Sequence, residues 1–277
     1  MLPHLKLVAG QSASELRVDR AGVAIGRTPI IREITFTARA GEFTAIIGPS
    51  GSGKTTLLKA MTGELAYSGS ILLAGLETGQ LSAEYLAQLR GVLPQASQIS
   101  FPLNVSEVVG LGVIDRRQGR ASRSRRIGEA LCRVGLAGFE GRTYQELSGG
   151  EQQRVQLARV LCQVWEPVAD GGQPRWLFLD EPVSSLDIKH QFQIMRLAAD
   201  YAASGGGVVA VMHDLNLTAA FADRILVMKN GRRLSFGARD EVMRADLLSD
   251  AYDFPLALTR FEESDVPLVV PAPGSDR

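Results

Sequence analysis

Short runs of apolar residues, each bounded by glycine or polar residues, mark the predicted strands of this chain. Residues 43–47 (FTAII) form a compact, mostly apolar run, which is typical of a strand buried on both faces. The same pattern predicts strands at 15–18, 30–36, 69–73, 176–179, 208–212 and 225–228. The Asn-Gly pair at 230–231 is a strong hairpin signal, so residues 232–236 are predicted as a return strand.

The apolar period changes in the middle of the chain. Residues 82–163 mostly follow the helical period, with loops at 97–102 and 116–124. We therefore predict an α/β fold with a parallel sheet, helices on its faces and a helical subdomain inserted at 92–162. Residues 1–258 are assigned to one domain and residues 259–277 to a C-terminal tail, predicted to be flexible from residue 264 onward because prolines are frequent there.

Composition narrows the class of protein. The 277 residues include 30 Lys plus Arg and 30 Asp plus Glu, and this zero net charge argues against nucleic-acid binding through bulk positive charge. No apolar stretch approaches the roughly 20 residues that a membrane-spanning helix needs. The two cysteines imply no disulfide framework. We expect a soluble protein, without nucleic acid as a partner.

A phosphate-binding loop is predicted between the strand at 43–47 and the helix that follows. Residues 48–55 (GPSGSGKT) fit the pattern G-x-x-x-x-G-K-[ST] in the strand–loop–helix context that the motif requires. Backbone N–H groups of such a loop surround phosphates, the lysine reaches the β- and γ-phosphates, and the hydroxyl binds Mg²⁺. The predicted nucleotide-binding residues are Gly48, Pro49, Ser50, Gly51, Ser52, Gly53, Lys54, Thr55 and Thr56.

An acidic pair follows the apolar strand at 176–179. Asp180 falls at the carboxyl edge of the predicted sheet, where ligands of such sheets bind, and a carboxylate there can hold Mg²⁺. Glu181 comes next and is a candidate for the base that deprotonates the attacking water. An acidic pair after a strand is usually a helix cap, but beside a phosphate-binding loop the catalytic interpretation is stronger.

A second anion-binding motif lies at 147–154 (LSGGEQQR). Ser148, Gly149, Gly150 and Glu151 occupy the predicted start of a helix, where free N–H groups attract phosphate. One nucleotide does not need two such motifs from one subunit, unless each motif serves a site that two subunits share.

These motifs resemble those of the ATP-binding subunits of ABC transporters, over roughly residues 16–258. The resemblance implies a P-loop NTPase with a RecA-like core, with ATP and Mg²⁺ as ligands. It also implies a working unit of two copies of the chain. In that unit the phosphate-binding loop of one copy and the signature motif of the other enclose each ATP.

The resemblance assigns roles to further residues. Gln95 matches the glutamine that links Mg²⁺ and the attacking water to the helical subdomain, and His213 matches the histidine that contacts the γ-phosphate. Ser185 and Asp187 match the loop that touches the opposite subunit. The implied catalytic residues are Lys54, Gln95, Glu181 and His213, and the implied Mg²⁺ ligands are Thr55, Gln95 and Asp180.

One element departs from the family pattern. An aromatic residue near position 25 usually stacks on adenine, but no Phe, Tyr or Trp precedes Phe36. We predict that Val23 or Ile25 supplies an apolar platform, with the loss of stacking worth about 1–3 kcal/mol. Adenine selectivity should therefore be weak.

Three segments indicate the kind of transporter. Residues 213–216 (HDLN) resemble importers for cobalamin, iron-siderophore complexes and haem, while 100–109 and 161–175 most resemble haem importers of Gram-negative bacteria. The resemblance implies a subunit that energises haem uptake at the cytoplasmic face of the inner membrane. A transmembrane permease dimer would hold it there, partly through a groove at Phe101 and Pro102, with a periplasmic substrate-binding protein as an indirect partner.

Other functions remain as alternatives at this stage. They are a cobalamin or iron-siderophore importer, an exporter subunit, and a soluble ABC ATPase acting on nucleic acid, which would need a long coiled-coil insertion or a second cassette. An arginine cluster could bind anionic headgroups, although a solvated surface loop is the favoured interpretation. The cluster comprises Arg116, Arg117, Arg120, Arg123, Arg125 and Arg126.

Overall fold

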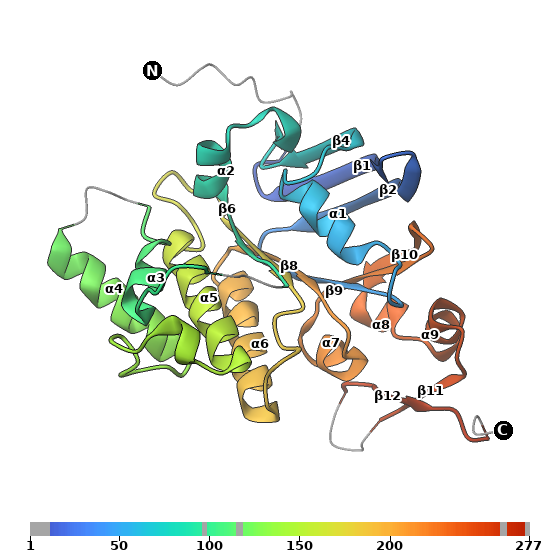
Figure 1. Cartoon of the computed structure of the whole chain (residues 1–277). Helices are drawn as coiled ribbons and strands as arrows, with labels where there is room; N and C mark the ends of the chain where they lie inside the picture. Colours follow the sequence, from blue (N-terminus) through green and yellow to red (C-terminus); the bar gives the residue numbers. More distant parts are fainter. Residues whose placement is uncertain (1–11, 96–98, 115–118, 261–264, 275–277) are drawn as a thin grey trace.

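A central sheet of six strands organises the computed structural model, which describes residues 12–95, 99–114, 119–260 and 265–274. Its strands are β3 (Phe43–Ile47), β6 (Arg90–Leu93), β7 (Trp176–Asp180), β8 (Gly207–Val211), β9 (Arg224–Lys229) and β10 (Arg232–Ala238). They lie in the order β10–β9–β3–β8–β7–β6 (Figure 1). All neighbours are parallel except the β9–β10 hairpin, so the predicted parallel sheet and the predicted return strand are confirmed.

The central strands are buried on both faces and separate two hydrophobic clusters. Alternate residues point to opposite faces, so Ala45 and Ile47 join one cluster and Ile46 joins the other. The first face is covered by α5 (Gly149–Gln163), α6 (Ile188–Ala203) and α7 (Leu215–Phe221). The second face is covered by α1 (Lys54–Met61) and an antiparallel sheet of β1 (Glu15–Ile25), β2 (Thr28–Arg39), β4 (Ser68–Leu73) and β5 (Leu76–Glu77).

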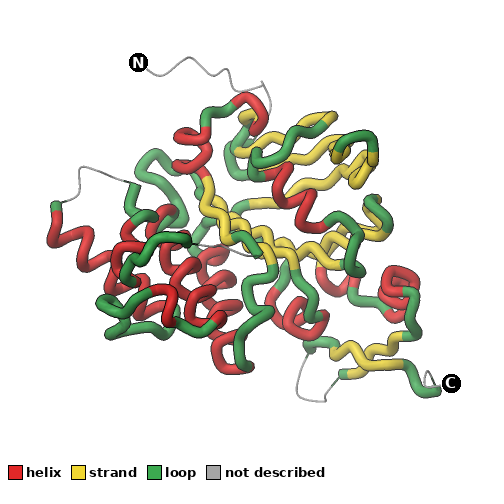
Figure 2. The backbone as a smooth tube through the Cα atoms, in the orientation of Figure 1, coloured by secondary structure: helices red, strands yellow, loops and turns green. Residues whose placement is uncertain are grey.

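The helical part of the chain forms a group beside the central sheet (Figure 2). It contains α3 (Val105–Gly110) and α4 (Arg120–Arg133), which both pack on α5, together with the short helix η2 (Tyr144–Glu146). Helix α2 (Ala83–Leu89) and the short helix η1 (Thr78–Gln80) lead into β6. The insertion is helical as predicted, and its limits at 92–162 stay a prediction.

Strand β6 is an exception within residues 82–163, which are predicted to be mostly helical. Its four residues are too few to show a period of their own, and pairing with β7, which lies more than 80 residues later in the chain, decides their conformation. A Cβ on Gly91 would lie 2.7 Å from Val160, so glycine lets α5 pack close against this strand.

The C-terminal part contains α8 (Arg239–Val242), α9 (Ala245–Tyr252), β11 (Leu256–Thr259) and β12 (Leu268–Pro271). The prediction of a flexible tail from residue 264 is wrong at 268–271, because β12 pairs with β11 and packs on α7. The Val269 N–H donates to Asn216 Oδ1 at 2.7 Å, and the Val269 side chain is buried. Tertiary contacts therefore order a segment whose prolines suggested a loose end.

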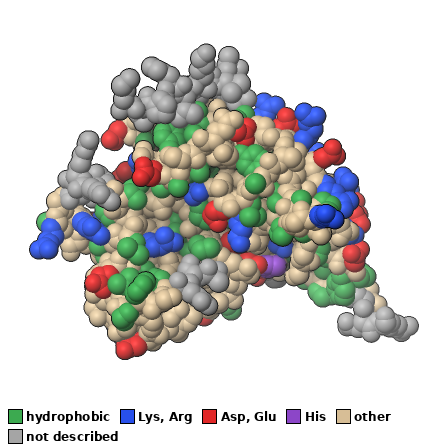
Figure 3. Space-filling view, turned by 45° about the horizontal axis from the view of Figure 1, so that its top comes forward, with side chains coloured by type: hydrophobic (Ala, Val, Ile, Leu, Met, Phe, Trp, Pro, Cys, Tyr) green, Lys and Arg blue, Asp and Glu red, His purple; other side chains and the backbone are tan. Residues whose placement is uncertain are grey.

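The surface carries both signs of charge. Basic and acidic side chains are interspersed over the face shown in Figure 3. Among the residues that the structure describes, no helix is long and apolar enough to cross a membrane.

Candidate nucleotide-binding site

The phosphate-binding loop leaves β3 at the carboxyl edge of the sheet and ends where α1 begins at Lys54. Gly48 has φ +146°, and a Cβ there would lie 2.1 Å from the carbonyl oxygen of Met228, so only glycine fits. Lys54 is 5% exposed, and its Nζ donates to the carbonyl oxygens of Gly48 at 2.8 Å and Pro49 at 3.1 Å. The lysine is therefore already held across the loop.

Asp180 meets the loop at the end of β7. The Thr55 hydroxyl donates to Asp180 Oδ1 at 3.0 Å, and the Asp180 side chain is buried. Burial raises the pKa of Asp180, opposed by the hydrogen bond from Thr55. Burial lowers the pKa of Lys54, opposed by the nearby carboxylates of Glu181 and Asp180. A buried ammonium group and a buried carboxylate thus lie close enough to interact electrostatically.

The oxygen donors of Thr55 and Asp180 fit a magnesium ion. Mg²⁺ prefers oxygen ligands and is usually held by one or two carboxylates together with substrate phosphates. Within the described ranges, no group of three or more His, Cys, Asp or Glu side chains could hold a metal by itself. The donor set therefore suits an ion whose remaining ligands come from a bound nucleotide and water.

Glu181 and His213 form a hydrogen-bonded pair beside the loop. His213 Nε2 lies 2.6 Å from Glu181 Oε1, and the Glu181 side chain is 15% exposed. Glu181 has φ +52°, an uncommon conformation for a residue other than glycine, which is found at functional sites more often than elsewhere. Its N–H donates to the carbonyl of Val211 at 3.1 Å. The ends of β7 and β8 thus bring together two residues that the sequence indicated separately.

A cavity of about 460 Å³ joins these groups and extends to an apolar edge. Its lining is Ile25, Ile30, Ser50, Gly51, Gly53, Lys54, Thr55, Thr56, Gln95, Glu181 and His213. Of the other predicted residues, Ser52 and Asp180 are buried beneath this surface, and Gly48 and Pro49 bind Lys54.

The apolar edge of the cavity shows which of the two predicted residues, Val23 or Ile25, is placed to contact a nucleotide base. Val23 is only 4% exposed and is not in the lining, so the prediction for Val23 is wrong. Ile25 is 61% exposed and lies in the lining together with Ile30, which the sequence reasoning missed.

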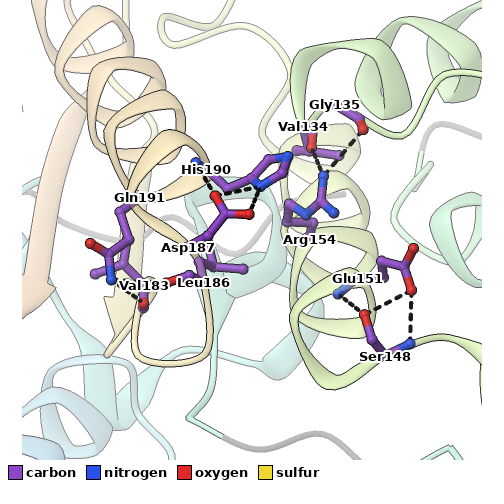
Figure 4. Close-up of polar contacts among 10 residues, drawn as sticks. All are labelled: Val134, Gly135, Ser148, Glu151, Arg154, Val183, Leu186, Asp187, His190 and Gln191. Carbon is purple, nitrogen blue, oxygen red and sulfur yellow. Dashed lines mark hydrogen bonds and ion pairs between the residues drawn. The ribbon is translucent and has the colours of Figure 1, made fainter.

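The signature motif forms a second cradle at the start of α5 (Figure 4). Ser148 caps the helix, and Glu151 Oε2 accepts from the Ser148 N–H at 2.8 Å and from its hydroxyl at 2.7 Å. These bonds to Ser148 lower the pKa of Glu151. A Cβ on Gly150 would lie 2.8 Å from the carbonyl oxygen of Ser185, so the glycine lets the 185–187 loop approach the helix.

The second cradle opens into its own cavity of about 400 Å³ between α5 and α6. Asp187 caps α6, and its carboxylate accepts from the N–H of His190 at 2.9 Å and lies 2.8 Å from its Nδ1. These bonds lower the pKa of Asp187. Arg154 faces them from α5 and donates to the carbonyls of Val134 and Gly135, both at 3.1 Å (Figure 4). The cavity lining is Ser148, Gly149, Gly150, Glu151, Arg154, Ser185, Leu186, Asp187 and His190.

Three residues of this lining, Arg154, Leu186 and His190, were not among the predicted site residues, although Arg154 ends the motif at 147–154 and Leu186 lies between Ser185 and Asp187. Arg154 lies one helical turn after Gly150, and His190 lies three residues after a helix-capping aspartate, so helical spacing could have identified both. The two cavities share no residue. Within one chain, the signature motif therefore does not line the cavity of the phosphate-binding loop.

The arginine cluster has structural contacts where the structure describes it. Arg123 donates to the carbonyl of Gly110 at 2.9 Å, and the guanidinium of Arg126 lies over the Trp165 ring. Arg125 forms a weak exposed pair with Glu129 at 4.0 Å. Arg116 and Arg117 lie outside the described residues. The prediction of a loop at 116–124 is wrong from Arg120 on, because α4 begins there, and the contacts of Arg123 and Arg126 show that the cluster is not simply a solvated loop.

A phosphate-binding loop after β3 of a parallel sheet, an acidic pair at the end of β7 two strands away and a signature helix on an inserted subdomain define a P-loop ATPase cassette. The family model described as ABC transporter matches residues 31–184, and the chain belongs to this family. It is 56% identical to the "Hemin import ATP-binding protein HmuV" of Jannaschia sp. (strain CCS1) over 92% of this chain and 94% of that protein. It is 52% identical to the protein of the same name from Rhizobium johnstonii, over 92% of this chain and 97% of that protein.

Solved structures agree with the fold. The ATP-binding cassette MJ0796, solved as a dimer in a post-hydrolysis state with ADP and Pi, superposes with a TM-score of 0.71 and 26% identity. The match covers 81% of this chain and 98% of that cassette. The predicted P-loop NTPase fold of the ABC ATPase type is therefore confirmed.

Proposed function

We propose that this chain is the ATP-hydrolysing subunit of an ABC importer that energises haem uptake. The observation that carries the proposal is 50–56% identity, over most of the chain, to relatives named for hemin import. Glu181 and His213 form a pair beside the loop that holds Lys54. Such a pair can activate a water molecule, which favours ATP hydrolysis over nucleotide binding alone.

Binding of the nucleotide phosphates would fall to the loop and to Lys54. Loop N–H groups and the start of α1 favour negative charge, and Lys54 can exchange its carbonyl partners for phosphate oxygens. Thr55 and Asp180 would hold Mg²⁺, with Gln95 in the same cavity, and the ion would neutralise charge on the phosphates.

Water activation would fall to Glu181. Its carboxylate is largely shielded from solvent, and the 2.6 Å contact with His213 fixes its direction toward the cavity. A carboxylate so placed can accept a proton from the attacking water, while His213 remains close enough to contact the terminal phosphate.

A second copy of the chain would complete the site. The signature cradle has a capped helix start and a cavity of its own, but that cavity is separate from the one at Lys54. Two copies placed head to tail would bring the cradle of one onto the nucleotide of the other, with Ser185 and Asp187 at the contact.

The permease would hold the subunit at the cytoplasmic face of the inner membrane. Phe101 is 74% exposed, and the Gln145 amide fixes its segment by donating to the carbonyls of Ile99 and Phe101. An exposed aromatic on a fixed loop suits docking of a partner helix. The periplasmic binding protein would act on this chain only through the permease.

The test is co-purification with the permease, followed by ATPase assays of the complex with haem and with cobalamin. Stimulation by haem is the expected result. Stimulation by cobalamin alone would refute the cargo, and a complex without ATPase activity would refute the function.

A further inference from the structure

We propose that Tyr252 of α9 is a positioning residue for the phosphate-binding loop, although it lies 204 residues from that loop in the sequence. The Gly48 N–H donates to the Tyr252 hydroxyl oxygen at 3.1 Å. The inference rests on the proposed ATPase function and deepens it, because it gives the C-terminal part of the chain a role at the nucleotide site.

Gly48 is held from two sides. Its N–H is bound by Tyr252, and its carbonyl oxygen accepts from Lys54 Nζ at 2.8 Å. Lys54 must give up carbonyl partners when it turns to nucleotide phosphates. The hydrogen bond to Tyr252 does not depend on that change, so it keeps the first residue of the loop in place while Lys54 moves.

Helix α9 is itself fixed to the central sheet, so Tyr252 does not lie on a loose end. Lys229, the last residue of β9, donates to Asp253 Oδ1 at 2.8 Å and to Asp250 Oδ1 at 3.1 Å. The preceding residue, Met228, has its carbonyl packed against Gly48. The end of β9 therefore contacts both the loop and α9, which lie next to each other in the fold (Figure 1).

The proposed positioning role of Tyr252 depends on its hydroxyl group. Burial raises the pKa of Tyr252 to about 12, so the side chain stays a neutral phenol at physiological pH. Its oxygen accepts from Gly48 without placing a negative charge near the phosphates. The ring packs partly against the core, and a phenylalanine would keep that packing while leaving the Gly48 N–H without its partner.

A second contact joins the same region to the His213 side of the site. Asn216 of α7, three residues after His213, accepts from the Val269 N–H of β12 at 2.7 Å. It also donates from Nδ2 to the Val269 carbonyl at 3.4 Å. The C-terminal elements thus contact the phosphate-binding loop through Tyr252 and the segment that follows His213 through Asn216.

The test compares Tyr252→Phe with Tyr201→Phe, a hydroxyl deletion on α6 away from the loop. The buried Tyr201 hydroxyl has no hydrogen-bond partner among the described residues, so its removal is a matched control. We expect Tyr252→Phe to raise the KM for ATP about three- to tenfold, the range that one neutral hydrogen bond supplies, with kcat within about twofold. Tm should fall more than in the control, because the buried Gly48 N–H is left without a partner, so the KM for ATP is the readout that separates positioning from stability.

Titration with a fluorescent ATP analogue should show the same loss of affinity, and this readout does not require hydrolysis. A wild-type KM and wild-type analogue affinity in Tyr252→Phe would overturn the positioning role. A lowered Tm with unchanged KM would show that the residue only stabilises the fold. A wild-type chain that binds the analogue but hydrolyses no ATP would instead refute the proposed function, and the binding titration would still judge Tyr252.

Discussion

Replacing Glu181 by glutamine isolates the proposed base from the rest of the site. The amide has nearly the same size, and its oxygen can still accept from His213 Nε2, which lies 2.6 Å from Oε1. The contacts of Lys54 with the loop and the Thr55–Asp180 hydrogen bond do not involve Glu181. The substitution therefore removes the proton acceptor and one negative charge, but leaves the phosphate-binding geometry intact.

The expected effect follows from these contacts. A positioned general base contributes about 10²- to 10⁴-fold, which corresponds to about 3–5 kcal/mol in activation free energy. ATP affinity should be retained or slightly increased, because the Glu181 charge near Lys54 is lost while the triphosphate is itself negative. Glu181→Gln should thus bind ATP, barely hydrolyse it and accumulate as a dimer.

The assay combines steady-state ATPase measurements with size-exclusion chromatography in ATP and Mg²⁺. Glu129→Gln is a suitable control, since Glu129 is exposed on α4 and only weakly paired. Normal turnover by Glu181→Gln, or loss of ATP binding to the same extent as loss of turnover, would refute the role of Glu181.

Three further substitutions test other parts of the site. Burial raises the pKa of Asp180, so its charge destabilises the nucleotide-free fold at neutral pH. Asp180→Asn should therefore raise Tm at pH 7, and this increase in Tm should shrink as the pH falls toward the ordinary aspartate pKa. The same substitution should abolish Mg²⁺-dependent ATPase activity. A lowered Tm at pH 7 would contradict this account. Ser148→Ala removes a helix cap worth about 1 kcal/mol and should lower Tm slightly. It should reduce ATPase activity more strongly than it reduces ATP binding by the monomer. Unchanged ATPase activity would count against the signature cradle. The wild type should hydrolyse ATP and GTP with similar KM values, and strict preference for ATP would argue against an apolar platform. Ile25→Tyr should lower the KM for ATP, because it adds a ring on which adenine can stack.

The central elements of the fold were predictable because they depend on local pattern. The strand at 43–47, the loop with Lys54 and the helix after it have apolar runs, glycines and spacing that belong to one motif. The strand at 176–179 likewise indicated where Asp180 and Glu181 would lie, since a parallel sheet brings strand ends to one edge. The contact between Thr55 and Asp180 follows from that topology.

Other features depend on contacts between distant segments, which one sequence does not display. Strand β6 is defined by pairing with β7, and β12 is held by β11 and by Asn216. The burial of Val23 beside an exposed Ile25 depends on irregular pairing in β1, where the register shifts near these residues. The Tyr252–Gly48 hydrogen bond joins the two ends of the domain, and no local pattern could have indicated it.

The most direct measurement of a nucleotide site shared between two copies is ATPase activity in a mixture of two inactive variants. Lys54→Ala disables the loop, and Ser148→Arg disables the signature cradle. In a mixed dimer one site carries both defects, while the other keeps an intact Lys54 from one copy and an intact Ser148 from its partner. Mixing the variants should restore ATPase activity that neither shows alone, whereas a mixture as inactive as its components would contradict the shared site.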